Sequence, residues 1–418
     1  MIKNDFEKYY LAIKYLEGIS NITKKNYVLK KDDRSFFINR LRYLLKLLNN
    51  PHRGFRFIHV AGTAGKGSTV NMIHEILTAA GHKVGSYFSP HPTTSIERIK
   101  VNDHFIAPND FAKLIESIKP ALKQCVLKGP DGHPSYFEVF LALAFLYFKK
   151  TRCQYVILEA GLGGRHDATN IIEKPLLNII TNIHYDHQDV LGGSLKEIAS
   201  DKAGIIKPGA TVITAEARLP LIKIFRQTCR RVKAEFIQLK TAGPDSNRAL
   251  AQQAAIILKI KERFIAQGLK RAKLPCRFEI IQAKPLTILD GAHNPVKMSM
   301  VAKNLSRLKY QKLILLLGMA ANKDHQKTLS AIAPLADQII LTRFLNPNRK
   351  TADLRKLQQI CAKYKIPVKV FLDPWQALAF GQKIQQAGDC LLITGSFFLT
   401  GELRTNWVTE NEILNKRI

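Results

Sequence analysis

Residues 55–69 decide the fold, and they read FRFIHVAGTAGKGST. The apolar run 55–60 predicts a short buried strand, and the apolar spacing over 70–77 predicts a helix that ends near Gly81. Between them, glycines let backbone N–H groups turn inward around phosphate oxygens, and the helix presents its positive end to the same anion. The order of strand, glycine-rich turn and helix therefore predicts a phosphate-binding loop.

Two side chains of this loop carry chemistry. Lys66 can reach terminal phosphates, and the hydroxyl of Ser68 can bind magnesium. The spacing departs from the strict G-x-x-x-x-G-K-[ST] motif, because Val60 stands at the first glycine position and Gly67 separates Lys66 from Ser68. The pattern favours a nucleotide site and leaves a plain glycine turn with a solvated lysine as the alternative.

Strands and helices are expected to alternate along the rest of the chain. Further strands are predicted at 155–158, 176–183 and 211–214, and helices at 36–48, 137–148 and 195–205. This alternation favours a mostly parallel sheet covered on both faces. A loop at 241–247 and a helix at 248–264 follow, and strands resume at 286–289, 313–317, 338–341, 368–371 and 391–394. We therefore predict an α/β protein with a larger N-terminal P-loop-type ATP-binding domain, residues 1–272, and a smaller C-terminal α/β domain, residues 273–418.

Composition and charge narrow the class of protein. The chain has 418 residues, of which 46% are hydrophobic, and 64 Lys and Arg against 33 Asp and Glu leave a net charge of +31. This composition is globular, and the charge calls for an anionic partner. The longest strongly apolar run, 139–148, is far shorter than the ~20 residues that cross a bilayer, so no membrane partner is expected. Six widely spaced cysteines form no CxxC pair, and the cytoplasm is the predicted location.

Acidic and histidine side chains follow two of the predicted strands. Glu159 ends one strand, and His184-Tyr-Asp-His187 follows the next. Ligands bind beyond the carboxyl ends of strands in such sheets, so Glu159 could hold magnesium or could equally cap or pair within the loop. Histidine is an uncommon magnesium ligand, which favours a hydrogen-bonded loop residue at His187, and Lys202 by its pattern alone is a solvated lysine.

Ordered motifs along most of the chain carry a resemblance to a known family. They are HVAGTAGKGST, SPH at 89–91, ERI at 97–99, FEV at 137–139, ILEAGLGGRHDATN at 157–170, DH at 186–187, KAGIIKPG at 202–209, RFE at 277–279, LDGAHNP at 289–295, KDH at 323–325 and TGSFFLTGE at 394–402. Together they resemble the folylpolyglutamate synthase/dihydrofolate synthase family of the ATP-dependent muramyl-peptide ligase superfamily.

The resemblance implies an ATP-dependent acid–amino-acid ligase. The carboxylate of a folate or a dihydropteroate would take the γ-phosphoryl group, and the amine of L-glutamate would attack the resulting acyl phosphate. Metal and lysine would neutralise the charge at the transferring group. The implied cofactors are ATP, two Mg²⁺ ions and a carbamylated Lys202, in a monomer of folate and one-carbon metabolism.

The resemblance also assigns roles to residues of this sequence. The phosphate cradle and the other ATP contacts are Gly62, Thr63, Gly65, Lys66, Gly67, Ser68, Asn247, Arg277 and Asp290. The implied metal ligands are Ser89, Glu159 and His187, and the implied catalytic residues are Lys66, Lys202 and His293. The implied acceptor pocket contains Ser135, Tyr136, Phe137, Glu138, His166, Asp167 and Ala168.

Several positions differ from the family pattern. Ala64 stands where the family usually has Asn, Pro92 and His166 stand where it usually has Leu, and Cys276 replaces a Gly. Pro92 and His166 are the departures nearer the implied acceptor. They motivate the alternative of a ligase with the same fold and a non-folate acceptor, and the charge motivates a second alternative, a nucleic-acid-binding ATPase. The lysines are spread through the chain without interleaved aromatic residues, which argues against nucleic acid.

Overall fold

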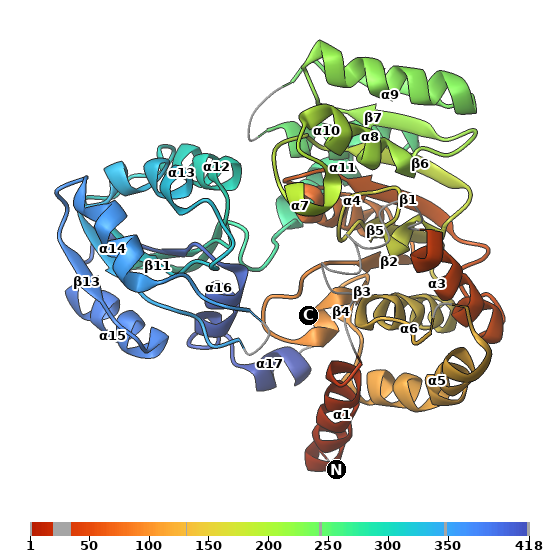
Figure 1. Ribbon diagram of the computed structural model, residues 1–418, viewed down its shortest axis with the longest axis horizontal. Coiled ribbons are helices and arrows are strands. Elements are labelled where there is room, and N and C mark those ends of the chain that lie inside the picture. The colour runs from red at the N-terminus through yellow and green to blue at the C-terminus, as the bar shows by residue number, and fades with distance from the viewer. Residues whose placement is uncertain (1, 20–34, 131, 242–244, 347–348, 416–418) are drawn as a thin grey trace. The chain divides into compact units, whose positions relative to one another are not determined.

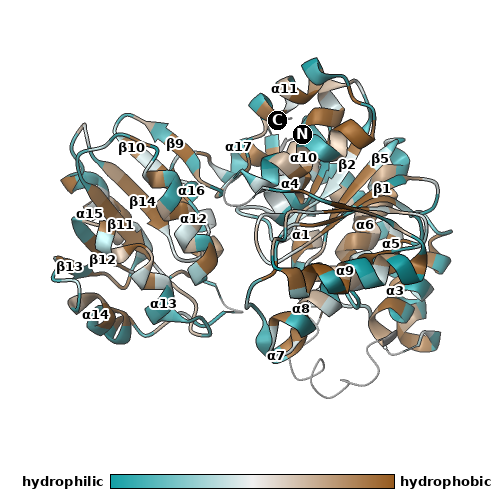
Figure 2. Ribbon diagram, turned by 90° about the horizontal axis from the view of Figure 1, so that it is seen from above, coloured by the Kyte–Doolittle hydropathy of each residue, from teal (hydrophilic) through white to brown (hydrophobic). Residues whose placement is uncertain are grey.

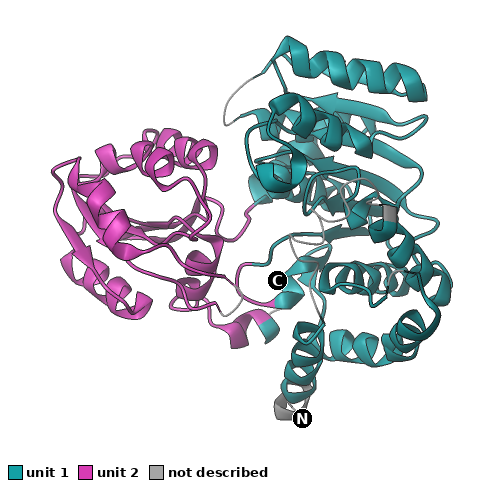
Figure 3. Cartoon of the chain, viewed as in Figure 1, with its two compact units in different colours: residues 1–91, 95–272, 414–418 teal, residues 92–94, 273–413 magenta. Residues whose placement is uncertain are grey.

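The computed structural model describes residues 2–19, 35–130, 132–241, 245–346 and 349–415. They divide into two compact units: unit 1 comprises the described residues of 1–91, 95–272 and 414–418, and unit 2 those of 92–94 and 273–413 (Figure 3). The main boundary between the two units lies between Ala272 and Lys273. Two short segments lie across it: 92–94 belongs to unit 2, and the described part of 414–418 belongs to unit 1. The domain assignment 1–272 and 273–418 stays a prediction.

Unit 1 is built on an eight-stranded sheet in the order β4-β3-β2-β5-β1-β6-β7-β8 (Figure 1). Only the pairs β2–β3 and β3–β4 are antiparallel. The strands are β1 (Arg56–Ala61), β2 (Val84–Tyr87), β3 (Ile99–Val101), β4 (His104–Phe105), β5 (Tyr155–Glu159), β6 (Pro175–Ile180), β7 (Thr211–Thr214) and β8 (Glu235–Gln238). The predicted mostly parallel sheet is confirmed.

Helices cover this sheet. They are α1 (Ile2–Glu17), α3 (Ser35–Leu47), α4 (Lys66–Ala79), α5 (Pro108–Lys128), α6 (Tyr136–Lys150), α7 (Gln188–Leu191), α8 (Leu195–Lys202), α9 (Leu219–Val232), α10 (Ser246–Ile257) and α11 (Glu262–Arg271), with short 3₁₀ turns η1 (Ser95–Arg98), η2 (Ala168–Ile171) and η3 (Ala203–Ile205). Val156 and Leu158 of β5 face an apolar cluster that α1, α3, α5 and α6 also line. Helix α4 packs against β1, β2 and β5. Because central strands are buried on both faces, they read as continuous apolar runs, which appear brown in Figure 2.

The helix predicted at 248–264 is wrong as a single element. Helix α10 ends at Ile257, Lys259 takes a left-handed conformation with φ of 58°, and α11 begins at Glu262. Both helices pack against α4. Gly268 of α11 lies so close to the backbone of Ile76 that a Cβ there would overlap it. The turn at Lys259 therefore lets both helices pack against α4, and the local apolar spacing does not reveal this packing.

Unit 2 contains a six-stranded sheet in the order β13-β12-β11-β14-β10-β9, parallel except for β9. Its strands are β9 (Glu279–Ala283), β10 (Leu286–Leu289), β11 (Leu313–Leu317), β12 (Gln338–Leu341), β13 (Val368–Val370) and β14 (Cys390–Thr394). Its helices are α12 (Pro295–Leu305), α13 (His325–Ser330), η4 (Ala333–Leu335), α14 (Leu354–Ala362), α15 (Pro374–Ile384) and α16 (Phe397–Arg404), and α17 (Glu410–Asn415) follows. The predicted second α/β sheet is confirmed. Among the described residues, no helix is both long and apolar enough to span a membrane.

Candidate active site

The phosphate loop joins β1 to α4 through two glycines that tolerate no side chain. Gly62 has φ of 148°, and a Cβ there would overlap the hydroxyl of Thr181. Gly65 has φ of 82°, and a Cβ there would overlap the side-chain amide of Asn247. Lys66, Gly67 and Ser68 begin α4, where the first N–H groups have no partner within the helix. The loop is therefore a narrow turn that leads into the positive end of a helix.

Residues just beyond β6 hold the loop, and the sequence analysis did not identify them. The N–H of Thr63 donates to the carbonyl of Asn182 at 2.9 Å, and the N–H of Ala64 donates to the Asn182 side chain at 2.9 Å. The Thr181 hydroxyl donates to the carbonyl of Ala64 at 2.7 Å. The signal was available, because polar Thr181 and Asn182 interrupt the apolar run predicted at 176–183. These bonds fix the shape of the loop before any ligand binds.

Two lysines converge on the loop. The Nζ atoms of Lys66 and Lys202 each donate to the carbonyl of Gly62 at 3.1 Å. Lys202 is 4% exposed, so the solvated lysine favoured by the helix pattern alone is wrong. Burial, and secondly the charge of Lys66, lower the pKa of Lys202 to about 7, against smaller opposing effects of nearby aspartates. The two lysine side chains that meet at the carbonyl of Gly62 make the loop a candidate anion-binding site. Loops of this kind bind phosphate oxygens.

The structure brings two of the three predicted metal ligands, Ser89 and Glu159, into direct contact. Glu159, buried at the end of β5, accepts a hydrogen bond from the N–H of Ser89 at 3.2 Å, so these two residues meet. His187 is the N-cap residue directly before α7, and its Nε2 lies 3.8 Å from Oδ1 of Asp186. In the described part of the chain, no three His, Cys, Asp or Glu side chains gather in a way suited to a metal ion. The hydroxyl of Ser89 and the carboxylate of Glu159 fit Mg²⁺ that is held by few protein ligands and by phosphate oxygens, and the roles of the three residues stay a prediction.

The predicted acceptor residues gather at the start of α6 and in the loop after β5. Ser135 and Glu138 form a capping box, and Glu138 accepts two 2.7 Å hydrogen bonds from Arg40. The Phe137 ring lies 5.6 Å from that of Tyr87, edge to face.

The predicted acceptor residues in the loop after β5 are held by hydrogen bonds to Asp167. Asp167 accepts from the N–H of Leu162 at 2.7 Å and from Thr169, and burial raises its pKa. Ala168 is buried beside it and His166 is partly exposed.

A buried chain of polar contacts behind the loop escaped the sequence analysis. His59 of β1 lies 2.8 Å from the Thr169 hydroxyl through its Nε2, and that hydroxyl donates to Asp167. Burial lowers the pKa of His59 to about 3, so the ring is neutral. The contacts link β1 to the loop that carries the predicted acceptor residues.

The remaining site residues lie in different units. Asn247 of unit 1 is beside Gly65, and its Oδ1 is buried without a hydrogen bond.

The other three predicted residues lie in unit 2. Asp290 accepts hydrogen bonds from the N–H groups of Phe278 and Ala292, each at 2.7 Å, and burial raises its pKa. Arg277 lies over the Phe397 ring at 4.5 Å. His293 contacts the Gly291 carbonyl through Nδ1 at 2.9 Å and the Lys297 ammonium through Nε2 at 3.1 Å. Their roles in nucleotide binding and catalysis stay a prediction.

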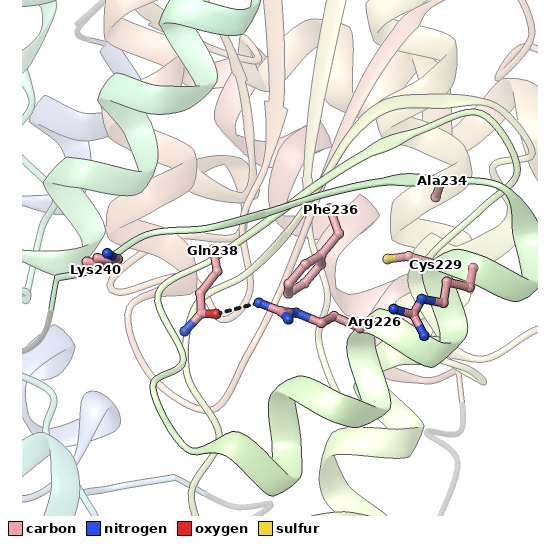
Figure 4. A pocket seen from close by; sticks show the side chains of 7 residues that line it. Arg226, Cys229, Ala234, Phe236, Gln238 and Lys240 are labelled. Atoms are coloured by element: carbon pink, nitrogen blue, oxygen red, sulfur yellow. Dashed lines mark hydrogen bonds between the residues drawn. The ribbon is translucent and has the colours of Figure 1, made fainter.

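A separate surface pocket of about 450 Å³ lies between α9 and β8 (Figure 4). It is lined by Arg226, Cys229, Arg230, Ala234, Phe236, Gln238 and Lys240. Arg226 lies over the Phe236 ring and donates to Gln238 at 3.3 Å. The lining has three cations and no carboxylate, so part of the excess basic charge gathers here. None of the predicted site residues lines this pocket.

The buried amine of Lys202 predicts a pH-dependent effect on stability. Its pKa is about 7 in the folded protein and 10.5 ordinarily, so the unfolded chain binds the proton more tightly. The group therefore opposes folding fully below pH 7, and this penalty fades as the pH rises toward 10.5. We expect Lys202→Met to raise the melting temperature relative to the original chain more at pH 6.5 than at pH 9.5. Thermal denaturation in buffers free of carbon dioxide measures it, and a pH-independent difference would contradict it.

Comparison with known families identifies the class of protein. Residues 60–259 match the Mur ligase middle domain, and residues 276–397 match the glutamate ligase domain of Mur ligases. A parallel sheet with a phosphate loop and a second α/β unit is the architecture of these ATP-dependent ligases. The protein is thus an enzyme of that class.

A curated relative specifies the family. The chain is 31% identical over 410 residues to the dihydrofolate synthase/folylpolyglutamate synthase of Bacillus subtilis, covering 88% of this chain and 94% of that protein. The chain belongs to the dihydrofolate synthase/folylpolyglutamate synthase family, and the predicted family is confirmed.

Solved structures agree with this assignment. FolC of E. coli in complex with DHPP and ADP superposes with a TM-score of 0.79 at 27% identity, covering 94% of this chain and 96% of that chain. A bifunctional folylpolyglutamate synthase/dihydrofolate synthase with Mn, AMPPNP and L-glutamate bound has a TM-score of 0.79 at 26% identity, covering 88% and 93%.

Proposed function

We propose that this enzyme uses ATP to join L-glutamate to the carboxylate of a folate, a dihydropteroate or both. The observation that carries the proposal is the convergence of Lys66 and Lys202 on the carbonyl of Gly62, inside a loop that glycines and Asn182 hold open for phosphate. The family supplies the substrate class, since relatives of this chain are solved with DHPP and ADP and with AMPPNP and L-glutamate.

The residues of unit 1 divide the work at the phosphates. The helix N–H groups after Gly65 and the ammonium of Lys66 bind and orient the triphosphate. The acceptor carboxylate attacks the γ-phosphorus, ADP leaves, and the glutamate amine then displaces phosphate from the acyl phosphate. Two Mg²⁺ ions, when bound by Ser89, Glu159 and His187 together with phosphate oxygens, supply neutralisation of the developing charge. Water must be excluded, because it would hydrolyse the acyl phosphate.

Lys202 is proposed to act as a carbamate. Only a neutral amine adds to carbon dioxide, and the lowered pKa of Lys202, about 7, makes the neutral form abundant near neutral pH. The nitrogen lone pair forms the N–C bond and a proton leaves, so a cation becomes a carboxylate-like anion. That anion could hold the second metal ion, while the unmodified amine could not.

The enzyme is proposed to act as a monomer in the cytoplasm, without nucleic acid. Six buried cysteines, all present as free thiols, agree with a reducing compartment. The basic pocket between α9 and β8 is the strongest concentration of cations described above, and its one aromatic ring lies under Arg226. That ring therefore offers little open face for stacking with a base.

A paired-substrate assay tests the function. Formation of ADP and phosphate is measured with folate or dihydropteroate and with L-glutamate, singly and together. We expect turnover only when an acceptor and glutamate are both present, and comparing the two acceptors separates a single from a double activity. Lack of turnover with every folate and pteroate would contradict the proposal. Turnover with a non-pterin acid, or stimulation by DNA or RNA alone, would support the respective alternative.

A further inference from the structure

Arg98 is a buried cation without a buried anion beside it. Three arginines of the described chain are buried, and Arg40 and Arg404 each pair with a carboxylate, Glu138 and Glu279 respectively. Arg98, at the end of η1, is 8% exposed, and no described carboxylate lies within ion-pair distance of its guanidinium. Burying an unpaired charge costs several kcal/mol, so such a group needs a compensating partner.

The neighbours of Arg98 in the structure are neutral. Its Nε donates to Nδ1 of His91 at 3.0 Å, and its Nη1 lies 3.4 Å from the Ser89 hydroxyl. Its guanidinium carbon lies 5.6 Å from the centre of the Tyr136 ring and 5.3 Å from that of Phe140. Two hydrogen bonds use two of the five N–H groups of a guanidinium. The rings offset part of the desolvation cost, but they do not neutralise the charge.

Arg98 contacts residues of two predicted sites, the metal site and the acceptor pocket. Ser89, which Arg98 contacts, is bonded to Glu159, and both are predicted metal ligands. Tyr136, over which Arg98 lies, is the first residue of α6 and a predicted acceptor residue. The guanidinium therefore lies between the expected metal–phosphate position and the expected acceptor position, within unit 1.

We propose that Arg98 binds the acceptor carboxylate that receives the phosphoryl group. The inference rests on the proposed function and gives a role to Arg98, which lies in the ERI motif at 97–99 but received no role in the sequence analysis. A guanidinium presents parallel N–H groups that match the two oxygens of a carboxylate. The ion pair neutralises Arg98 when the acceptor is bound and fixes the direction in which the carboxylate oxygen approaches the γ-phosphorus. Arg98 takes no proton and forms no covalent bond.

A comparison of acid and amide ligands tests the proposal. Pteroate has one carboxylate, and its carboxamide has the same shape without the charge. We expect the original enzyme to bind the acid more tightly than the amide by about 10- to 100-fold, the strength of a charge-assisted hydrogen-bonded pair. In Arg98→Gln this ratio should fall to about 1 to 3, because the remaining donors are uncharged, while the KM for ATP stays within about twofold. Arg98→Lys keeps the charge without the fork and should retain an intermediate ratio.

Arg404→Gln is the matched control. It also removes a buried guanidinium, but one already paired with Glu279 in unit 2. Neither residue is among the predicted acceptor residues, so we expect it to lower the melting temperature and to leave the acid-to-amide ratio unchanged. The proposal is overturned if Arg98→Gln and Arg98→Lys keep the original ratio, or if Arg404→Gln reduces the ratio as much.

The test separates this inference from the proposed function. If the original enzyme turns over another carboxylic acid in place of a pteroate or folate, the proposed acceptor is wrong. The ratio is then measured with that acid and its amide. A charge-dependent loss in Arg98→Gln would support the role of Arg98 for the new acceptor, and an unchanged ratio would overturn it.

Discussion

Gly65→Ala is expected to weaken nucleotide binding by about 100-fold or more and to abolish ligation at ordinary ATP concentrations. The alanine would have to take φ of 82°, and its Cβ would overlap the buried side chain of Asn247. Backbone strain contributes about 1–3 kcal/mol, and the overlap forces the loop or Asn247 to move. Since about 1.4 kcal/mol corresponds to a factor of ten, both effects together give the expected loss. Titration calorimetry with a non-hydrolysable ATP analogue measures it.

The other end of the same helix offers a matched control. Gly81 follows the carboxyl end of α4 with φ of 85°, and nothing lies within 4 Å of the position of a Cβ. Gly81→Ala therefore carries the same backbone strain without an overlap, and we expect a loss of stability of about 1 kcal/mol with unchanged nucleotide affinity. Equal effects of the two variants on affinity would show that general strain, rather than the shape of the phosphate loop, explains the loss.

Lys66→Gln is expected to lower kcat by about 10²- to 10³-fold, with a smaller effect on nucleotide affinity. The ammonium of Lys66 lies over the loop at the carbonyl of Gly62, where it can follow the charge of the transferring phosphoryl group. Interactions that strengthen in the transition state act on kcat, whereas helix N–H groups bind the ground state as well. Steady-state kinetics of ADP formation, combined with the binding titration, separate the two effects.

Removing any lysine also lowers the positive field of a chain with a net charge of +31, so a second lysine variant is needed. Lys196 is exposed on α8, the helix that carries Lys202. Lys196→Gln makes the same charge change away from the loop, and we expect kcat to stay within about twofold, since only long-range steering changes. A comparable loss of kcat in both variants would contradict a specific role of Lys66.

The sequence by itself determined the family, the class of fold and the phosphate loop of this protein. These features are local or ordered along the chain. A buried parallel strand needs a continuous apolar run such as 155–158, and a turn around phosphate needs glycines at Gly62 and Gly65. Chemistry that depends on neighbours in sequence can be read from sequence. Strands as short as β3 and β4, with three and two residues, were not predicted, because so few residues show no apolar pattern of their own.

Only the tertiary structure decided which groups are buried and what they meet. Lys202 lies 140 positions from Gly62 along the chain, yet burial places its amine at that carbonyl and lowers its pKa to about 7. Asn182 braces a loop 118 positions away. Arg98 and Arg40 are both buried, yet only Arg40 of the two has a carboxylate beside it among the described residues. Desolvation and ion pairing depend on the three-dimensional surroundings of a side chain, and no periodicity in the sequence encodes those surroundings.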